Sequence, residues 1–477
     1  MALLLILLAP LAAAGFALLP LDRRAAPLAT LAAALIVLGL ALSVAAAATG
    51  GRVEAFGGAL SCDGLGALVL VLVAFVGSTA ALYSWGYIGH RPESAGGTRL
   101  YYCLYNLFIL SMVAVPIVSN LALVWVAVEL TTLISAFLVG FDGTPEALEA
   151  AWKYVVLTTL GAVVALLGFL ILYWGSQLEG AAPFTWAGLV AAAPHMPPAL
   201  LWPAFLFILV GFGTKVGLVP MHTWLPDAHS QAPASICALL SGVETTTALY
   251  VILRLFPVLG AAPWLDARPW YLGLGLLSVA IAALLLVFVR DFKRLFAYST
   301  VEHMGIILFA AGIGGADAHL GALYQIAAHS IAKSFCFFAA GLAAMAMGTQ
   351  EIAAVRGLAR SAPLPAAALI AGALAIAGAP PFAVFVGEFL ILKGGLAAGD
   401  YVTIGLFAGF IVLGFCAILF HVNRMVFGGG SERARPAAPL SCRAGLALAA
   451  IPLFVIGIYV PPALFALLRA AAGALGS

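Results

Sequence analysis

The feature of this sequence that most constrains its fold is a series of long, uninterrupted apolar runs. One of them, LGLGLLSVAIAALLLVFV at 272–289, contains no charged residue. A run of this length can cross a bilayer as a helix, and in lipid its backbone N–H and C=O groups must be paired within the segment. Transmembrane β-strands instead alternate apolar and polar residues. The runs therefore predict an all-α polytopic membrane protein.

The composition excludes the main soluble classes. Charged residues make up 8% of the 477 residues and hydrophobic residues make up 64%, whereas a soluble domain carries about 25% charged residues. So few charges cannot cover a water-exposed surface, which excludes a soluble enzyme, a disordered chain and a fibrous protein. The net charge of +2 leaves no strongly basic face for nucleic acid. We expect a multi-pass protein of the cell inner (plasma) membrane.

Polar breaks divide the chain into fourteen candidate spans. They lie near 2–20, 26–48, 63–89, 101–119, 121–140, 148–174, 200–221, 230–255, 270–289, 296–314, 318–347, 365–391, 402–427 and 444–469. Cytoplasmic loops are enriched in Lys and Arg. Odd-numbered loops hold fourteen of these residues, whereas even-numbered loops and the C-terminus hold five. This asymmetry predicts odd loops in the cytoplasm and both termini outside. The first apolar run lacks the basic start of a signal peptide, so we expect it to be retained as a span.

Ionisable residues within these spans are the candidate functional residues. A charged side chain at membrane depth costs about 2.5–3.5 kcal/mol on insertion scales, so such residues usually have a function. The set within or near the spans is Glu129, Lys153, Lys215, Glu244, Glu302, His303, His329, Lys333 and Glu388. His329 and Lys333 are four residues apart and share one helix face. A string of pairable, titratable groups on a buried axis would have this nearly balanced composition.

Structural roles compete with functional ones for several of these residues. Glu302, Lys153 and Glu388 lie close to predicted helix ends, where charged side chains can extend to the interface. Glu129 and Lys215 lie deeper, where they could form a purely structural ion pair.

Four other ionisable residues could also have structural rather than functional roles. The sequence separately predicts no metal and no cofactor. Glu244 could accept a hydrogen bond from the threonines that follow it, and His222, Asp227 and His229 of PMHTWLPDAH could be ordinary loop residues. The six cysteines are scattered, and none forms a C-x-x-C motif. This pattern argues against zinc, iron–sulfur clusters and a disulfide framework.

Two of the spans are interrupted by Gly and Pro. One contains GFGTKVGLVP (211–220) around Lys215, and the other contains GAPPFAVFVG (378–387) before Glu388. Paired broken segments indicate inverted repeats with a site at the membrane midplane. Glu129 and Lys215 are 86 residues apart, as are Glu302 and Glu388, with an offset of 173. We therefore predict two inverted five-helix repeats, in 101–255 and 270–427, between an N-terminal three-helix segment (1–100) and a C-terminal helix (428–477).

Six segments of the chain resemble one known family. The sequence resembles the antiporter-like membrane subunits of respiratory complex I, Mrp-type cation/proton antiporters and group 4 membrane-bound hydrogenases. The segments, in order between about 100 and 430, are WVAVELTTLISAFLVG, AWKYVVLTTLGA, GFGTKVGLVPMHTWLPDAHSQAPASICALLSG, RDFKRLFAYSTVEHMG, HSIAKSFCFFAAG and GAPPFAVFVGEFLILK. AYSTVEHMG and the short chain are most similar to the F components of hydrogenase-4.

The resemblance implies both a fold and a set of functional residues. The fold would have fourteen helices, two inverted five-helix repeats, broken helices 7 and 12, and a hydrated proton path along the membrane centre. The family's Glu of helix 5 matches Glu129, and its Lys of helix 7 matches Lys215. Its helix 11 pair matches His329 and Lys333, and the acidic form of its helix 12 residue matches Glu388.

The chain departs from the family on helix 8, where members often carry a connecting Lys or His. The corresponding positions here hold Thr246 and Leu239, which leaves Glu244 as the ionisable residue in reach. The chain is also too short for the long lateral helix of the complex I subunit at the far end of the arm.

A proton relay is the mechanism that these residues and the resemblance favour. A neighbouring subunit would open and close a Glu129–Lys215 pair. The change would then pass along the other relay groups: Glu244, His329, Lys333 and Glu388. Residues that could serve proton entry or coupling are Lys153, His222, Asp227, His229, Glu302 and His303.

The expected partners are other membrane subunits of a complex I-like or hydrogenase complex and, through them, a peripheral redox arm. Two other functions remain open at this stage. One is a redox-independent cation/proton antiporter or ion-coupled uptake subunit, and the other is a structural membrane scaffold. The chain shows no redox site of its own; haem ligation by His222, His303 and His329 explains fewer residues than the resemblance does.

Overall fold

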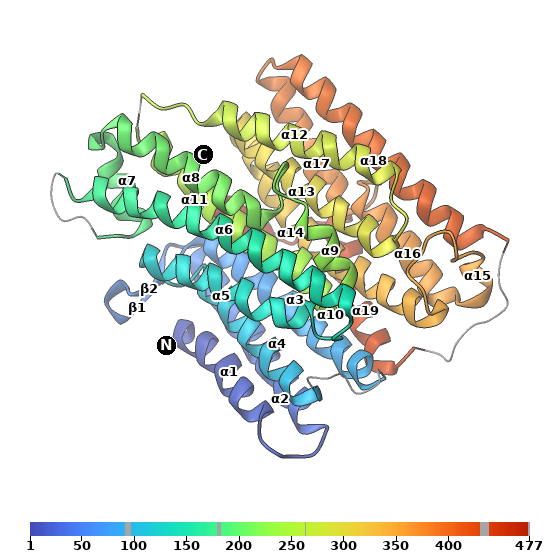
Figure 1. Cartoon of the computed structure of the whole chain (residues 1–477). Helices are drawn as coiled ribbons and strands as arrows, with labels where there is room; N and C mark the ends of the chain where they lie inside the picture. Colours follow the sequence, from blue (N-terminus) through green and yellow to red (C-terminus); the bar gives the residue numbers. More distant parts are fainter. Residues whose placement is uncertain (91–96, 179–182, 263, 430–437, 476–477) are drawn as a thin grey trace.

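The computed structural model describes residues 1–90, 97–178, 183–262, 264–429 and 438–475. Helices packed side by side make up almost all of this part of the chain (Figure 1). The structure therefore confirms the predicted all-α membrane architecture. Three basic residues of the predicted cytoplasmic loops lie outside the described residues, namely Arg91, Arg433 and Arg435.

The N-terminal part contains four helices and a short hairpin. The helices are α1 (Ala2–Ala17), α2 (Ala25–Ala48), α3 (Gly64–Gly89) and α4 (Gly97–Ala114). The hairpin joins α2 to α3 through β1 (Val53–Ala55), the 3-10 turn η1 (Phe56–Gly58) and β2 (Leu60–Cys62). The two strands pair antiparallel, with Val53 opposite Cys62. This hairpin was not predicted, because three-residue strands carry too little periodicity to be recognised.

The next part of the chain extends from α5 to α11. Its elements are α5 (Leu121–Val139), α6 (Pro145–Ser176), α7 (Trp186–Ala192), η2 (Ala193–His195), α8 (Pro198–Val216), α9 (Trp224–Gln231), α10 (Ala234–Leu239), the π-helical turn η3 (Leu240–Glu244) and α11 (Thr245–Gly260). Asn120 caps α5, and Thr144 caps α6 ahead of Pro145 at its first position.

The last part extends from α12 to α20. Its elements are α12 (Arg268–Val287), α13 (Phe292–Ile313), α14 (Ala316–Met347), α15 (Leu358–Ser361), α16 (Pro363–Ile376), α17 (Ala383–Ala397), α18 (Tyr401–Phe427), α19 (Leu440–Ile458) and α20 (Pro462–Gly473). The predicted last span, 444–469, is divided into α19 and α20 by a break that ends in two prolines.

Both predicted helix breaks are present. The helix α8 ends at Val216 and is followed by Gly217 at φ 83°, and α16 ends at Ile376 shortly before Gly378 at φ 77°. Glycine is the residue that adopts this left-handed conformation without a steric cost. Lys215 lies before its break, whereas Glu388 lies after its own.

The offset of 173 residues therefore does not relate equivalent positions. Glu388 lies ten residues beyond Gly378, and the residue ten beyond Gly217 is Asp227. Asp227 rather than Lys215 thus occupies the place that corresponds to Glu388 relative to the two breaks.

Helix lengths agree with a polytopic membrane protein. Within the described residues, eleven helices are long and apolar enough to cross a membrane, and α1, α16 and α20 are shorter apolar helices. The count of fourteen spans and the two inverted repeats stay predictions.

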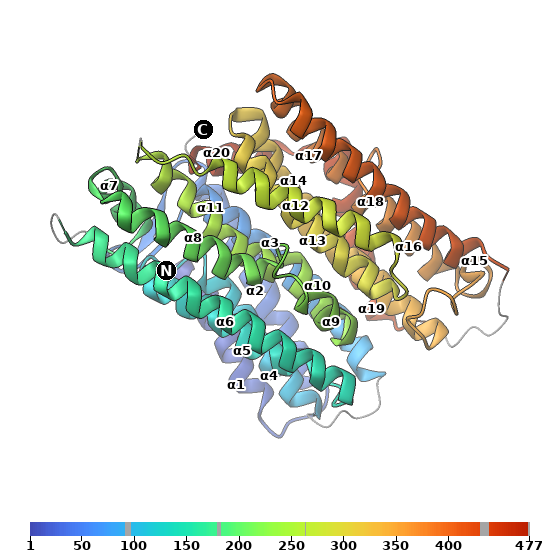
Figure 2. The same ribbon diagram turned by 45° about the horizontal axis from the view of Figure 1, so that its top comes forward.

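Burial separates central helices from peripheral ones. In the apolar 18-residue stretch of each helix, all residues are buried in the helix 234–260, compared with 89% of the residues in α13, 39% in α6 and 28% in α18. Figure 2 shows α18 along one edge of the bundle, with α12 and α13 between it and α8. Large apolar side chains such as Trp152 and Phe137 point outward from peripheral helices, as expected for a surface covered by lipid. The central helices carry the buried residues Glu244, Glu302, His303, His329 and Lys333.

Candidate functional site

The centre of the site is a buried ion pair between α8 and η3. Lys215 lies in the last turn of α8, and its Nζ is 2.8 Å from Oε1 of Glu244. Both side chains are almost fully buried, with 0% and 1% of their surfaces exposed. Taking two charges out of water is costly unless geometry and further hydrogen bonds compensate for it. The pair must therefore be supported by neighbouring polar groups.

Hydroxyl groups of α5 and α6 provide that support. Thr131 and Tyr154 donate to Oε1 of Glu244 at 3.0 and 2.7 Å, and Lys215 donates to Thr132. The Tyr154 hydroxyl is also 2.7 Å from that of Ser135. Oε1 of Glu244 thus accepts three hydrogen bonds, whereas its Oε2 has no partner among the described residues.

Glu129 does not pair with Lys215, contrary to the sequence-based hypothesis. Its Oε1 accepts a 2.7 Å hydrogen bond from Thr159 of α6, and its buried Oε2 has no partner within the described chain. Thr132, one turn further along α5, occupies the position beside the Lys215 ammonium. The partner of Lys215 is the helix 8 carboxylate that the sequence singled out as a departure from the family.

The turn η3 connects this pair to a second polar cluster. Three residues before Glu244, the Ser241 hydroxyl is 2.6 Å from that of Thr300 on α13. The Ser241 carbonyl accepts a 3.1 Å hydrogen bond from Nε2 of His329 on α14. Gly242 follows Ser241 in the turn, and a Cβ at this position would approach the Ser330 carbonyl of α14 to 3.0 Å. A π-helical turn often marks a functional site, and this one contacts both clusters.

Two histidines extend the second cluster towards the break after α16. The rings of His303 and His329 have centroids 5.1 Å apart. His303 Nε2 donates to the Ile376 carbonyl at 2.9 Å, and its Nδ1 accepts from Gln325 at 3.1 Å. One ring nitrogen is therefore a donor and the other an acceptor, as in a neutral imidazole. The Ile376 carbonyl belongs to the last turn of α16, which the break deprives of its usual intrahelical donors.

Lys333 lies one helical turn beyond His329 on α14, as its i+4 spacing predicted. Its Nζ donates to the Phe296 carbonyl at 2.6 Å and to the Ser299 hydroxyl, both on α13. The side chain is completely buried. Glu302, three residues after Ser299, is close enough for its charge to act on Lys333. No carboxylate among the described residues forms a direct ion pair with Lys333.

Glu302 and Glu388 are buried carboxyl groups that each face a glycine. The Glu302 carboxylate lies against Gly414 of α18, and that of Glu388 lies against Gly378 at the helix break; a Cβ at either glycine would collide with it. The charge of Glu302 also acts on Glu388. Both side chains are less than one-tenth exposed, so snorkelling to an interface does not explain either of them.

A third group of charges lies at one end of the central helices. Asp227 of α9 is 3.3 Å from Lys153 of α6 and 2.7 Å from Arg294 of α13, and Lys153 also contacts Glu149 at 2.6 Å. These basic side chains are 46% and 41% exposed, so the group is accessible from the surface. Lys153, a candidate for snorkelling in the sequence, is such an exposed residue.

The remaining predicted residues occupy separate positions. His222 lies between α8 and α9, with its ring 6.4 Å from that of Tyr298. His229 is fully buried and donates from Nδ1 to the Leu225 carbonyl at 2.8 Å, while its Nε2 is unpartnered in the described structure. Lys293 is buried nearby and donates to the carbonyls of Ser230 and Ala232 at 2.8 and 2.7 Å. Sequence analysis had counted Lys293 among the cytoplasmic loop residues.

Sequence reasoning missed the hydroxyl groups and a second buried ion pair. The hydroxyl residues are common in helices, so only their position beside Glu244 distinguishes them. Arg254, at the end of the predicted span 230–255, is buried in α11 and contacts both carboxylate oxygens of Asp63 at 2.5 and 2.6 Å. Within the described residues, no group of three or more His, Cys, Asp or Glu side chains is arranged to hold a metal ion.

Comparison with known proteins identifies the family of this chain. Residues 118–414 match the family model described as NADH:quinone oxidoreductase/Mrp antiporter, TM. The chain belongs to this family. A protein of Methylacidiphilum infernorum named Hydrogenase-4 component F homolog is 40% identical over 408 residues, covering 84% of this chain and 85% of that protein. NADH-quinone oxidoreductase subunit N of Desulforudis audaxviator is 31% identical over 414 residues, covering 84% and 80%.

Solved structures of other membrane complexes show the same fold. A chain of the archaeal membrane-bound sulfane sulfur reductase superposes with a TM-score of 0.87 at 23% identity, covering 99% of this chain and 97% of that one. A chain of respiratory complex I from Thermus thermophilus gives 0.83 at 24% identity, with both chains fully covered. The predicted family resemblance and fold class are confirmed.

Proposed function

We propose that this chain is a proton-translocating membrane subunit of a redox-driven complex of the hydrogenase or NADH-quinone oxidoreductase type. The observation that carries the proposal is the π-helical turn 240–244. Its Glu244 carboxylate belongs to the Lys215 cluster, and its Ser241 contacts His329 and Thr300 of the second cluster. One fully buried turn therefore contacts both the Lys215 cluster and the His329 cluster.

The Lys215–Glu244 pair is suited to hold and release a proton. An ammonium and a carboxylate in contact can exchange a proton, and the balance between their charged and neutral forms depends on nearby charges. Moving one charge against 100 mV costs about 2.3 kcal/mol, and a change of one pKa unit corresponds to 1.36 kcal/mol. A charge brought close to this pair in a low-dielectric interior supplies energies of that order.

Unpartnered buried atoms support a hydrated route between the clusters. Oε2 of Glu129, Oε2 of Glu244 and Nδ1 of His329 have no hydrogen-bond partner among the described residues. Buried polar atoms are rarely left unpaired, and ordered water is their usual partner where protein groups are absent. We propose that water connects Glu129 to the pair and His329 to Lys333.

The two ends of the route differ in character. Asp227 with Lys153 and Arg294 offers a surface-accessible group for proton entry or coupling, close to His222 and His229. Glu302 and Glu388 form the acidic end of the buried series beyond His303. In this scheme a proton enters near Asp227, passes the central pair and the histidines, and leaves from the carboxyl groups.

The driving reaction must be supplied by other subunits. The relatives named above are components of a hydrogenase and of an NADH-quinone oxidoreductase, and we propose a comparable assembly here. The partners would be further membrane subunits and, through them, a peripheral redox arm. We place the protein in the inner membrane with both termini outside, since the Lys/Arg asymmetry favours that orientation.

Replacement of Glu244 by Gln tests the proposal in the intact complex. The amide oxygen can accept the bonds from Lys215, Thr131 and Tyr154, and the NH2 group takes the place of the unpartnered Oε2. Glu244→Gln removes the counter-charge of Lys215, but a buried lysine, unlike an arginine, can lose its proton and become neutral. The complex should therefore still assemble, while the number of protons moved per electron falls by about tenfold or more. Redox turnover and vesicle acidification are measured on the same preparation, with Lys393→Gln as control because Lys393 lies in an exposed pair.

A substitution at Lys215 distinguishes a proton relay from a structural ion pair, because the two roles predict opposite results. Lys215→Arg keeps the positive charge but holds its proton far too tightly to release it, so proton movement should fall while assembly is retained. A purely structural ion pair would instead tolerate Arg. Normal proton movement in both Glu244→Gln and Lys215→Arg would refute the relay. Movement that requires sodium and proceeds without redox turnover would favour an independent antiporter.

A further inference from the structure

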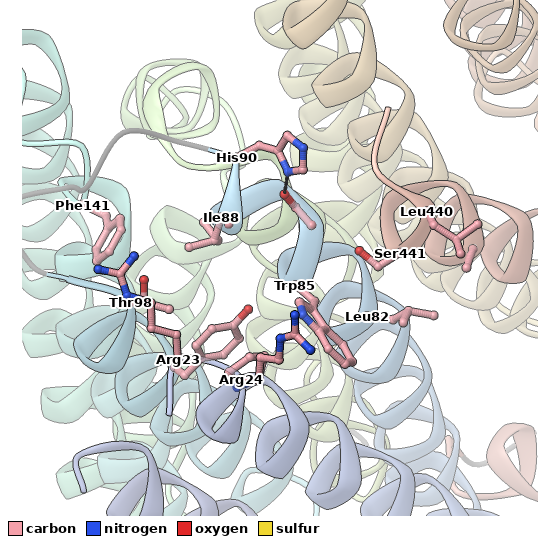
Figure 3. Close-up of a pocket in the computed structure, with 15 residues that line it drawn as sticks. Arg23, Arg24, Leu82, Trp85, Ile88, His90, Thr98, Phe141, Leu440 and Ser441 are labelled. Atoms are coloured by element: carbon pink, nitrogen blue, oxygen red, sulfur yellow. Dashed lines mark hydrogen bonds between the residues drawn. The ribbon is translucent and has the colours of Figure 1, made fainter. Parts of the chain in front are cut away.

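A cavity of about 700 Å³ lies at the end of the bundle where the α1–α2 turn meets the end of α3 and the starts of α4 and α19 (Figure 3). None of the residues that line it is assigned to proton movement. Arg23 and Arg24 enter it from the α1–α2 turn, and Leu440 and Ser441 lie on its other side. Its size falls in the range of small-molecule sites.

The described wall of the cavity is electropositive. Two arginines and a histidine line it, and none of its fifteen described lining residues is Asp or Glu. The helices α2 and α19 both begin at the cavity. The Ala25 N–H at the start of α2 already donates to the Asp22 carbonyl, whereas no side chain caps the first turn of α19. Unpaired N–H groups and the positive end of the helix dipole favour an anion. Charge and backbone geometry therefore indicate the same kind of ligand.

Tyr102 adds a neutral donor at the floor of the cavity. The residue is 1% exposed and lines the cavity. No hydrogen bond of its hydroxyl is found within the described residues, although the tyrosines around it do form such bonds. A buried hydroxyl normally has a partner, so an oxygen-bearing ligand in the cavity would satisfy it.

The remaining walls are apolar and lie at the edge of the bundle. Leu82, Trp85 and Ile88 of α3 line one side, and Leu440 of α19 is 82% exposed. Tryptophan is enriched where a membrane protein meets the lipid headgroups. A ligand that matches the whole cavity has an anionic head and a hydrocarbon tail.

We propose that this cavity binds the headgroup of an anionic phospholipid. The phosphate is held by Arg23, Arg24, the start of α19 and the Tyr102 hydroxyl, and an acyl chain extends along Trp85 and Leu440. Basic pockets between transmembrane helices on the cytoplasmic side are suited to such headgroups. The proposal concerns a site separate from the proton route and does not depend on the proposed function.

Quenching of tryptophan fluorescence by brominated lipids tests this site on the full-length chain in vesicles. Phosphatidylcholine vesicles contain the same fraction of either brominated phosphatidylglycerol or brominated phosphatidylcholine. Binding at the cavity predicts stronger quenching by the anionic lipid, and Trp85→Phe should abolish this excess. The double variant Arg23→Ala/Arg24→Ala should lower it by about threefold or more, whereas Arg290→Ala, an exposed arginine elsewhere, should not change it.

Further measurements distinguish lipid binding from the binding of a soluble anion and from an effect of misfolding. Inorganic phosphate, added at matched ionic strength, should leave the excess quenching intact; loss of the excess would identify a free-phosphate site and overturn the proposal. Persistence of the excess in Trp85→Phe or in the folded double arginine variant would also overturn it. Should the double variant fail to fold, Tyr102→Phe decides, because it removes one hydroxyl only and must weaken the excess.

Discussion

Single residues of this protein show how far the cost of a buried charge can guide prediction. Because each charge in the membrane is expensive, the sequence identified Lys215, Glu244 and Lys333 as important, and the structure buries all three. It could not identify their partners, since these depend on how helices rotate against one another. Glu129 was expected beside Lys215, but the helix α5 presents Thr132 there and directs Glu129 towards α6.

A prediction at this scale concerns Asp63, which precedes α3 and contacts the buried Arg254. Asp63→Asn leaves the Arg254 guanidinium without its counter-charge, which should destabilise the protein by about 3 kcal/mol. Thermal unfolding in detergent measures this loss. Asp266→Asn is the matched control, since its pair with Arg268 is more than half exposed and should contribute less than about 1 kcal/mol.

The same pair predicts a pH dependence. Burial alone would raise the pKa of Asp63, but the charge and hydrogen bonds of Arg254 and the Gly66 N–H hold that pKa below its ordinary value of 3.8. The stabilisation is therefore complete at neutral pH and is lost as the pH falls through the pKa of the folded state. The difference in melting temperature between wild type and Asp63→Asn should stay constant from pH 7 to 5 and narrow below about pH 4. A constant difference down to pH 3 would contradict the assignment.

The sequence predicted the long helices and their breaks better than the short elements that connect them. Gly and Pro correctly marked the ends of α8 and α16, because these residues remove backbone constraints or hydrogen bonds at fixed places. The π-helical turn 240–244 has no comparable signal in LSGVE, and neither the hairpin before α3 nor the separate helix α9 was foreseen. The middle of the candidate site lies on the first of these unpredicted features.

Close helix contact gives a prediction at the scale of elements. The helices α6 and α8 touch at Gly211, where an added Cβ would lie 2.5 Å from the Ala165 backbone nitrogen. Gly211→Ala should force the helices apart and destabilise the protein by about 1–3 kcal/mol, and thereby lower the amount of folded chain. Gly39→Ala in α2 is the control, because nothing lies within 4 Å of its added Cβ. Equal melting temperatures for the two variants would show that this contact is not a constraint.

At the scale of the whole molecule, the arrangement around the central helices could not be deduced from hydropathy. A helix that contacts lipid on one face and protein on the other is apolar on both, so its sequence carries little amphipathic pattern. This explains why α6 and the helix 234–260 are both long apolar runs, although 39% of the residues are buried in the apolar stretch of α6 and all of them in that of the helix 234–260. The orientation of the chain in the membrane can be predicted from the sequence, because the Lys/Arg asymmetry of the loops does not depend on how the helices pack.

That asymmetry predicts which ends of the helices face the cytoplasm. The loop between α14 and α15 should lie inside and the β1–β2 hairpin outside. Ala354→Cys and Glu54→Cys, each exposed, report on these two positions in a cysteine-free background, which is needed because Cys416 is exposed in the native chain. A membrane-impermeant maleimide added to intact cells should label the cysteine at 54 and reach that at 354 only after the membrane is opened. The reverse pattern would invert the proposed direction of the proton route, because its entry group at Asp227 would then face outside.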